Sequence, residues 1–161
     1  MSRAIVKGVH AARPPYGLRP VREVNEGKVN VRWELDPEES PVVKEMVRLA
    51  IEENLGFKSI GDRLSSKGYR ARGGRPFAAF TVQKILTNPA VKGTLAYGRK
   101  PRKGNPAVEQ VEVEGFFPPI LSADEWQRLH ERLNIRRETL VVGGRPDFRH
   151  GRLVDDPFAV V

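Results

Sequence analysis

Residues 29–35 alternate apolar and polar side chains, which is the pattern of a half-buried β-strand. Val29, Val31, Trp33 and Leu35 are separated by single polar residues. A second candidate strand, 21–24, precedes them, and Asn25-Glu26-Gly27 lies between the two segments. We therefore expect a β-hairpin over 21–35.

After this hairpin the apolar period changes from two residues to between three and four, which favours a helix. Asp36 is suited to cap it, with Pro37 at the first position and Glu39 three residues after the cap. Ser40-Pro41 offers a second start. We expect the helix to end near Asn54 and to bury one stripe, made of Val43, Met46, Val47, Ala50 and Ile51.

Two short apolar-periodic segments follow, at 57–66 and 78–87. The first carries Ile60 and Leu64, and the second carries Val82, Ile85 and Leu86. The loop KGYRARGGRPF, residues 67–77, separates them. Two helices joined by a turn indicate a helix-turn-helix motif over about 57–88. This loop exceeds the usual three or four residues, so the motif is expected to be a loose or winged variant.

The second half predicts two more strands, at 93–97 and 108–113, joined by a basic loop at 98–107. Ser122 and Glu125 form a capping box, and an amphipathic helix is expected over 123–139. We predict an α+β, mainly helical fold with small β-hairpins. Residues 1–20 are expected to form an N-terminal arm, 21–140 the domain, and 141–161 a linker or tail.

Charge changes this picture, because it is concentrated in one stretch. The chain has 161 residues, enough for one domain, and a net charge of +8. Residues 58–104 hold twelve Lys and Arg residues and one acid, Asp62, a net +11, while 36–57 sums to −4 and 105–140 to −3. This favours a polyanion such as nucleic acid as partner. A membrane surface and a merely solvated basic face remain the alternatives.

Other kinds of chemistry find little support. The chain has no cysteine, and its three histidines are scattered. We find no nucleophile beside a base, no acid–base pair and no metal-ligand cluster, so no catalytic residue, metal or cofactor is expected. No apolar stretch approaches the length of a membrane span, and the N-terminus lacks the apolar core of a signal peptide. We expect a cytoplasmic protein.

The candidate DNA-binding residues follow from these elements. If Val82, Ile85 and Leu86 are buried, then Gln83, Lys84 and Thr87 face outward, where short polar side chains contact base edges. A solvated helix is the alternative, and Phe77 and Phe80 are expected in the core. Phosphate or minor-groove contacts are expected from arginines and lysines of the arm and loops. The full set is Arg13, Tyr16, Arg19, Arg70, Arg72, Arg75, Ala79, Thr81, Gln83, Lys84, Thr87, Lys92, Arg99, Lys100, Arg102 and Lys103.

Five stretches, in order, resemble the central DNA-binding domain of the large serine recombinases (serine integrases and transposon resolvase relatives). They are RPPYGLR (13–19), LDPEESPVVKEMVRLAIE (35–52), SIGDRLSSKGY (59–69), FAAFTVQKILTNPAVKG (77–93) and PPILSADEWQRLHERL (118–133). Departures from the family's pattern are Gly61 for Ala, Ser65 for Asn, Phe77 for Trp, Ala78 for the capping Ser and Val91 for Tyr.

The resemblance implies duplex DNA binding at an attachment or transposon-end site, by a protein encoded by a bacterium, phage or mobile element. It also implies two partners absent from this sequence, a catalytic domain with the serine nucleophile and a zinc ribbon, so we expect an excised central domain or a remnant, inactive as an enzyme on its own. The alternatives are a standalone helix-turn-helix regulator and a basic RNA-binding protein.

Overall fold

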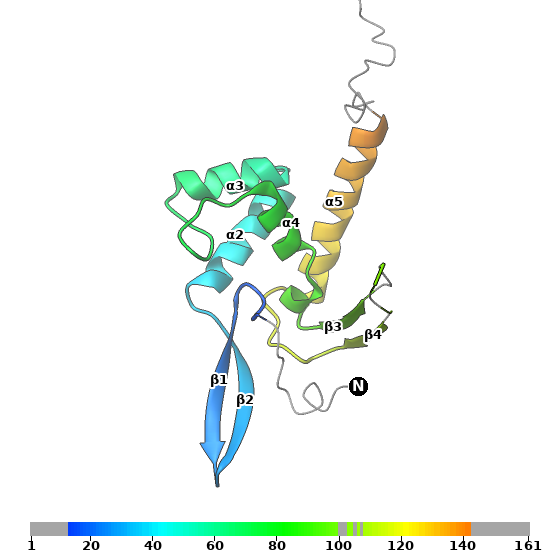
Figure 1. The fold of residues 1–161 in the computed structure, drawn as a ribbon. Coiled ribbons are helices and arrows are strands. Elements are labelled where there is room, and N and C mark those ends of the chain that lie inside the picture. The colour runs from blue at the N-terminus through cyan, green and yellow to red at the C-terminus, as the bar shows by residue number, and fades with distance from the viewer. Residues whose placement is uncertain (1–12, 100–102, 105, 107, 143–161) are drawn as a thin grey trace, which may run out of the picture.

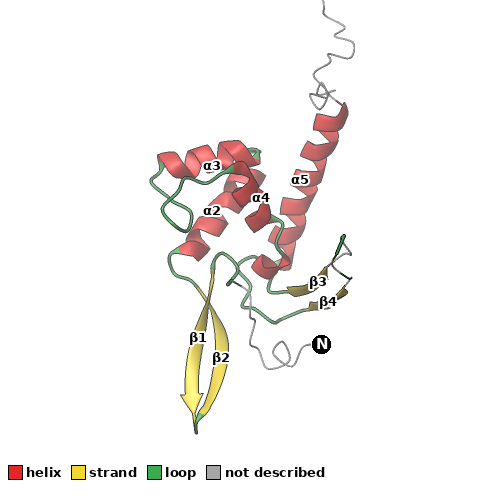
Figure 2. Ribbon diagram, in the orientation of Figure 1, coloured by secondary structure: helices red, strands yellow, loops and turns green. Residues whose placement is uncertain are grey.

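The computed structural model describes residues 13–99, 103–104, 106 and 108–142, and its helices gather at one end of a long hairpin (Figures 1 and 2). Helices and two antiparallel two-stranded sheets make an α+β fold, as predicted. The elements in chain order are β1 (Leu18–Asn25), β2 (Lys28–Leu35), α2 (Glu39–Ile51), α3 (Phe57–Ser66), α4 (Ala79–Leu86), the 3-10 helix η1 (Pro89–Lys92), β3 (Leu95–Arg99), β4 (Val108–Val113) and α5 (Ala123–Val142).

The β1–β2 hairpin is confirmed and points away from the helices (Figure 1). It closes at Glu26-Gly27, whose φ angles of 50° and 75° suit the tight turns that join right-twisted strands. Pairing begins at Leu18↔Leu35, three residues before the predicted start of the first strand. The alternation of apolar and polar residues did not predict that residues 18–20 belong to the strand. Only the base of the hairpin is buried, where Leu18 is 1% exposed.

Helix α2 crosses the middle of the structure and supplies much of the core. Asp36 caps the turn that leads into it, since its Oδ1 accepts hydrogen bonds from the backbone N–H groups of Glu38 (2.8 Å) and Glu39 (3.0 Å). These bonds also hold the pKa of the Asp36 carboxyl below its usual value. The helix itself begins at Glu39, two residues after the predicted first position, Pro37. The predicted apolar stripe is buried at Val43, Met46, Val47 and Ala50, while Ile51 is partly buried.

Helix α3 has the predicted bounds and ends in a Schellman motif. Gly68, at φ +88°, donates its N–H to the Ser65 carbonyl at 3.1 Å. The next residue, Tyr69, donates to the Leu64 carbonyl at 3.0 Å. A side chain at position 68 would be strained in this conformation, so glycine fixes the point where the chain leaves α3.

Helices α3 and α4 pack closely through side chains that are fully buried, among them Ile60, Leu64 and Val82. Gly61 permits a close approach, because the Phe77 carbonyl oxygen occupies the space that a Cβ at position 61 would need. Gly61, which replaces the family's alanine, therefore leaves room for the loop before α4. This contact fixes how α4 leaves the loop.

The second half differs from prediction at the 3-10 helix, at both ends of β3 and at the end of α5. The 3-10 helix η1 was not expected; Asn88 starts it by accepting a hydrogen bond from the Ala90 N–H at 3.0 Å. Strand β3 begins at Leu95, two residues later than predicted, because Gly93 still ends η1. The bounds of β4 and the capping box are confirmed, the latter by Ser122 N–H to Glu125 (2.9 Å) and Glu125 N–H to Ser122 Oγ (3.2 Å).

Helix α5 runs to Val142, three residues beyond the predicted end, so the first two residues of the expected 141–161 tail are helical. Residues 143–161, and residues 1–12 of the expected arm, lie outside the described part of the chain. Trp126 of α5 is partly buried and packs against the core. Within the described residues, no helix is both long and apolar enough to cross a membrane.

Candidate nucleic-acid interface

Helix α4 has one buried and one exposed face. Val82, Ile85 and Leu86 are 0–7% exposed and pack into the core. The side chains at Ala79, Gln83, Lys84 and Thr87 are exposed, as predicted, and Thr81 is partly exposed. The Thr87 hydroxyl donates to the Gln83 carbonyl at 2.7 Å, so its proton is already used and the hydroxyl oxygen is left as an acceptor. The outward face thus presents an amide, an ammonium and a hydroxyl.

Phe80 lies on this same outward face, and its predicted place in the core is wrong. It is 63% exposed, whereas Phe77, given the same expectation, is 4% exposed. The two rings differ because Phe77 precedes α4 and lies against α3, while Phe80 lies two residues before Val82, roughly 200° around the helix. The Lys84 Nζ lies 4.6 Å from the centre of the Phe80 ring.

The loop between α3 and α4 is internally hydrogen-bonded. The Ala71 N–H donates to the Arg75 carbonyl at 2.8 Å, and the Gly74 N–H to the Ala71 carbonyl at 3.0 Å. Arg75 is exposed. Arg70, also exposed, donates from Nη1 to the carbonyls of Ser65 and Tyr69 at 2.9 Å each. These bonds hold the Arg70 guanidinium beside the end of α3, whereas Arg75 takes part in the loop through its backbone carbonyl and has an exposed side chain.

Arg72 is turned into the protein, in contrast to its predicted place on DNA. It forms a bidentate pair with Glu39 (2.6 and 2.5 Å) and donates to the carbonyls of Pro14 (2.6 Å) and Pro15 (3.2 Å). Hydrogen bonding to Glu39 raises the Arg72 pKa. We call this group the Glu39–Arg72 latch. A bidentate arginine that is only 27% exposed has little capacity left for phosphate.

The latch also holds the arm against the helices. Glu39 accepts a hydrogen bond from the Gly17 N–H at 2.9 Å. The Tyr16 ring lies 5.4 Å from the Arg72 guanidinium and edge-on to Phe77 at 5.9 Å. Burial, with the nearby Glu39 charge, raises the pKa of Tyr16 to about 12. Tyr16 is therefore partly committed to packing, while Arg13 is exposed and Arg19 makes a long, exposed pair with Glu34 at 3.4 Å.

Acids of α2 and the turn after it neutralise part of the basic stretch. Lys67 pairs with Glu45 at 2.5 Å, and Arg63 pairs with Glu53 at 3.1 Å. Lys58 pairs with Asp62 within α3 at 2.8 Å. Sequence analysis missed the first two pairs because their members are 22 and 10 residues apart. The local charge of 58–104 therefore overstates what this face offers a ligand.

Lys92, Arg99 and Lys103 lie in or next to the β3–β4 hairpin. Lys92 places its Nζ 5.5 Å from the Trp126 ring. Arg99 ends β3, and Lys103 is exposed in the turn that follows. Lys100 and Arg102 fall outside the described residues. The structure thus brings Arg70, Arg75 and the α4 face to one helix–loop–helix unit, with the hairpin loop on a separate element.

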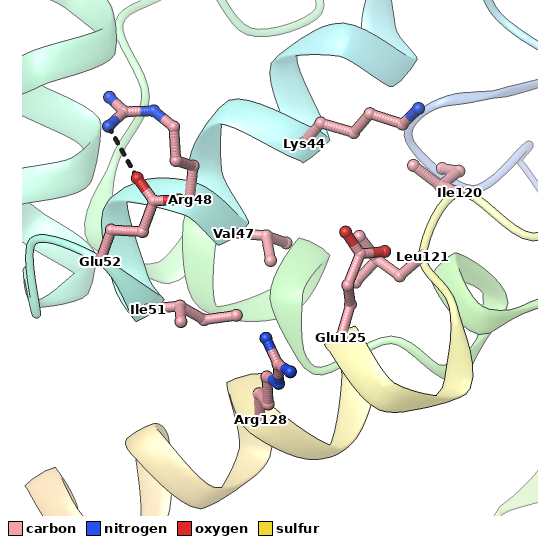
Figure 3. Close-up of a pocket in the computed structure, with 9 residues that line it drawn as sticks. All are labelled: Lys44, Val47, Arg48, Ile51, Glu52, Ile120, Leu121, Glu125 and Arg128. Carbon is pink, nitrogen blue, oxygen red and sulfur yellow. Dashed lines mark hydrogen bonds and ion pairs between the residues drawn. The ribbon is translucent and has the colours of Figure 1, made fainter.

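A cavity of about 320 Å³ lies between α2 and α5. Figure 3 shows Arg48 of α2 paired with Glu52, the residue after that helix, with Glu125 and Arg128 on α5. Glu125 belongs to the α5 capping box, and Arg128 pairs with Asp124 at 3.1 Å. Because these charged groups already pair with residues close to them in sequence, we assign the cavity no ligand. No cluster of possible metal ligands is found in the described part of the chain.

Comparison with known proteins identifies the family to which this chain belongs. The family model described as Recombinase matches residues 37–136, well over half of the chain. The chain belongs to the Recombinase family. The predicted resemblance to the large serine recombinases is thereby confirmed for the helical part, while the arm and the β1–β2 hairpin lie before the matched residues.

A solved structure has a similar fold. The Recombinase chain is similar to a large serine recombinase in the crystal structure of its complex with DNA, with a TM-score of 0.50 and 20% sequence identity. The similarity covers 78% of this chain and 33% of that one. This chain therefore corresponds to about a third of that protein's length. No curated protein matches it.

Proposed function

We propose that this domain binds duplex DNA as the central domain of a site-specific serine recombinase and positions the enzyme on an attachment or transposon-end site. The observation that carries the proposal is the exposed polar face of α4, flanked by exposed guanidinium groups of the loop before it. Recombinase membership supplies the biological setting. Strand cleavage belongs, in this proposal, to a catalytic domain, and a zinc ribbon is a further partner.

Helix α4 has the dimensions and chemistry of a recognition helix. An α-helix with its side chains is about 10–12 Å across, which matches the roughly 12 Å width of the major groove. The Gln83 amide matches the paired donor and acceptor of adenine, and the Lys84 ammonium matches the acceptors of guanine. Ala79, Thr81 and Thr87 complete the surface that faces the groove. Helix α3 then lies across the backbone, as the first helix of such motifs does.

The phosphate contacts come from cations that lack a carboxylate partner among the described residues. Arg70, Arg75 and Lys92 fit this description, and Lys103 lies on the hairpin loop beyond them. Arg13, Arg19, Arg99, Lys100 and Arg102 extend the candidate set along the arm and that loop. The proposal removes Arg72 from the DNA contacts and gives it the latch. Phosphate contacts set affinity and register, while α4 sets sequence preference.

Salt dependence tests the proposal. If roughly five to eight phosphates are neutralised, the logarithm of the association constant falls against the logarithm of salt concentration with a slope of about −5 to −7. We expect this slope on duplex DNA, tighter binding to the duplex than to structured RNA of equal length, and no nicking of a supercoiled plasmid. A slope near zero, or a preference for the RNA, contradicts duplex DNA as the ligand.

A further inference from the structure

Phe80 is exposed without a structural reason within the described fold. It occupies the second position of α4 and is 63% exposed, although Val82, Ile85 and Leu86 already supply the buried face of that helix. An exposed aromatic ring leaves a large apolar surface in water. Phenylalanine also has a lower helix propensity than alanine or leucine. The position therefore gains nothing in folding that a smaller or polar residue would not supply.

The ring is held in a defined place by its neighbour. Lys84 lies four residues on, directly above Phe80 on the helix surface, with Nζ 4.6 Å from the ring centre. This cation–π contact orders the long lysine side chain beside a ring that has only two side-chain torsions. The outward face of α4 thus carries a preorganised pair, one apolar surface and one ammonium donor.

The major groove presents one apolar group that suits such a ring, the 5-methyl group of thymine. Resting on the proposed function, we propose that Phe80 determines specificity by packing on a thymine 5-methyl group when α4 occupies the groove. Lys84, held beside the ring, donates to the N7 and O6 acceptors of a guanine next to that thymine. The preferred site then contains a thymine at a position where the methyl group itself is recognised.

Uracil substitution tests this at the level of one methyl group. Duplexes that bind the full chain are first enriched from a random pool, and each thymine of the enriched site is then replaced by uracil, which keeps base pairing and removes only the methyl group. At one or two positions we expect uracil to weaken binding by about three- to fivefold, the effect of one buried methyl group. Phe80→Ala should bind the thymine and uracil duplexes equally there.

Val24→Ala is the matched control, since Val24 is 69% exposed near the tip of the β1–β2 hairpin and its truncation also removes exposed apolar surface. It should keep the full sensitivity to uracil. Thermal unfolding of both variants checks that the fold is intact. An enriched site without thymine, uracil that is tolerated at every position, or a Phe80→Ala variant as sensitive as the wild type overturns the role of Phe80 and leaves DNA binding standing. Failure to bind any duplex overturns the proposed function as well.

Discussion

Glu45 joins two helices through a single carboxylate. It accepts hydrogen bonds from Arg48 on its own helix, at 2.8 and 2.9 Å, and from Lys67 just after α3 at 2.5 Å. These bonds, with Arg48 the larger cause, lower the Glu45 pKa from 4.5 to about 2. Because the folded state holds the proton less tightly than the unfolded state, the stabilisation is complete above about pH 4.5 and is lost as the pH falls toward 2.

We therefore predict that Glu45→Gln lowers the free energy of unfolding at pH 7 by about 1 kcal/mol, since both cationic partners are partly exposed and solvent screens the pair. Denaturant unfolding at pH 7, 5, 4 and 3 should show the gap between wild type and variant closing with acid. Glu112→Gln, at an exposed position on β4, is the control and should change little. A gap that stays constant down to pH 3 refutes the assignment.

Helix α4 begins without a side-chain cap. Ala78, in extended conformation at φ −74° and ψ 151°, occupies the N-cap position and makes no side-chain hydrogen bond to the helix. Serine at this position accepts a hydrogen bond from the backbone N–H of the second or third helical residue. Ala78→Ser should therefore stabilise the domain by about 0.5–1 kcal/mol in denaturant unfolding. The backbone already has the required conformation, so the substitution costs no rearrangement.

Ala123→Ser is the matched control for this gain. Ala123 opens α5, which Ser122 already caps, so a second hydroxyl there has no free cap to make. If Ala78→Ser stabilises no more than Ala123→Ser, the start of α4 is not limited by its missing cap. Such a result would also contradict the view that α4 is weakened by Ala78 in place of the family's capping serine.

At the scale of helices and strands, the features that depend on contacts between residues close in sequence were predictable. The Asp36 cap, the α5 capping box and the turn that closes β1–β2 depend on residues within four positions of each other. The 3-10 helix η1 was missed because a single turn carries no apolar period. The start of β1 was missed because its first residues are defined by pairing with β2, seventeen positions away at Leu18↔Leu35.

At the scale of the whole molecule, the sequence located the basic face but did not predict how many of its cations remain free of ion pairs and able to bind a ligand. Charge summed along the chain cannot show that Glu39, Glu45 and Glu53 reach cations of the next two segments. The outward face of α4 was predictable because its buried stripe is defined by three large side chains. The exposure of Phe80 followed from the same stripe, since it lies about 200° around the helix from Val82, and the prediction that placed it in the core rested on its residue type alone.

The central claim is that α4 supplies sequence preference while the hairpin loop supplies only general affinity. The direct measurement compares binding of wild type, Gln83→Ala, Lys84→Ala and Lys103→Ala to the enriched site and to random DNA at two salt concentrations. We predict that the α4 variants lose most of the gap between the two DNAs, at about 1–3 kcal/mol for each base contact. Lys103→Ala should weaken both DNAs equally and reduce the salt slope by about 1. Lost discrimination in Lys103→Ala, with discrimination kept in Gln83→Ala and Lys84→Ala, would contradict the account.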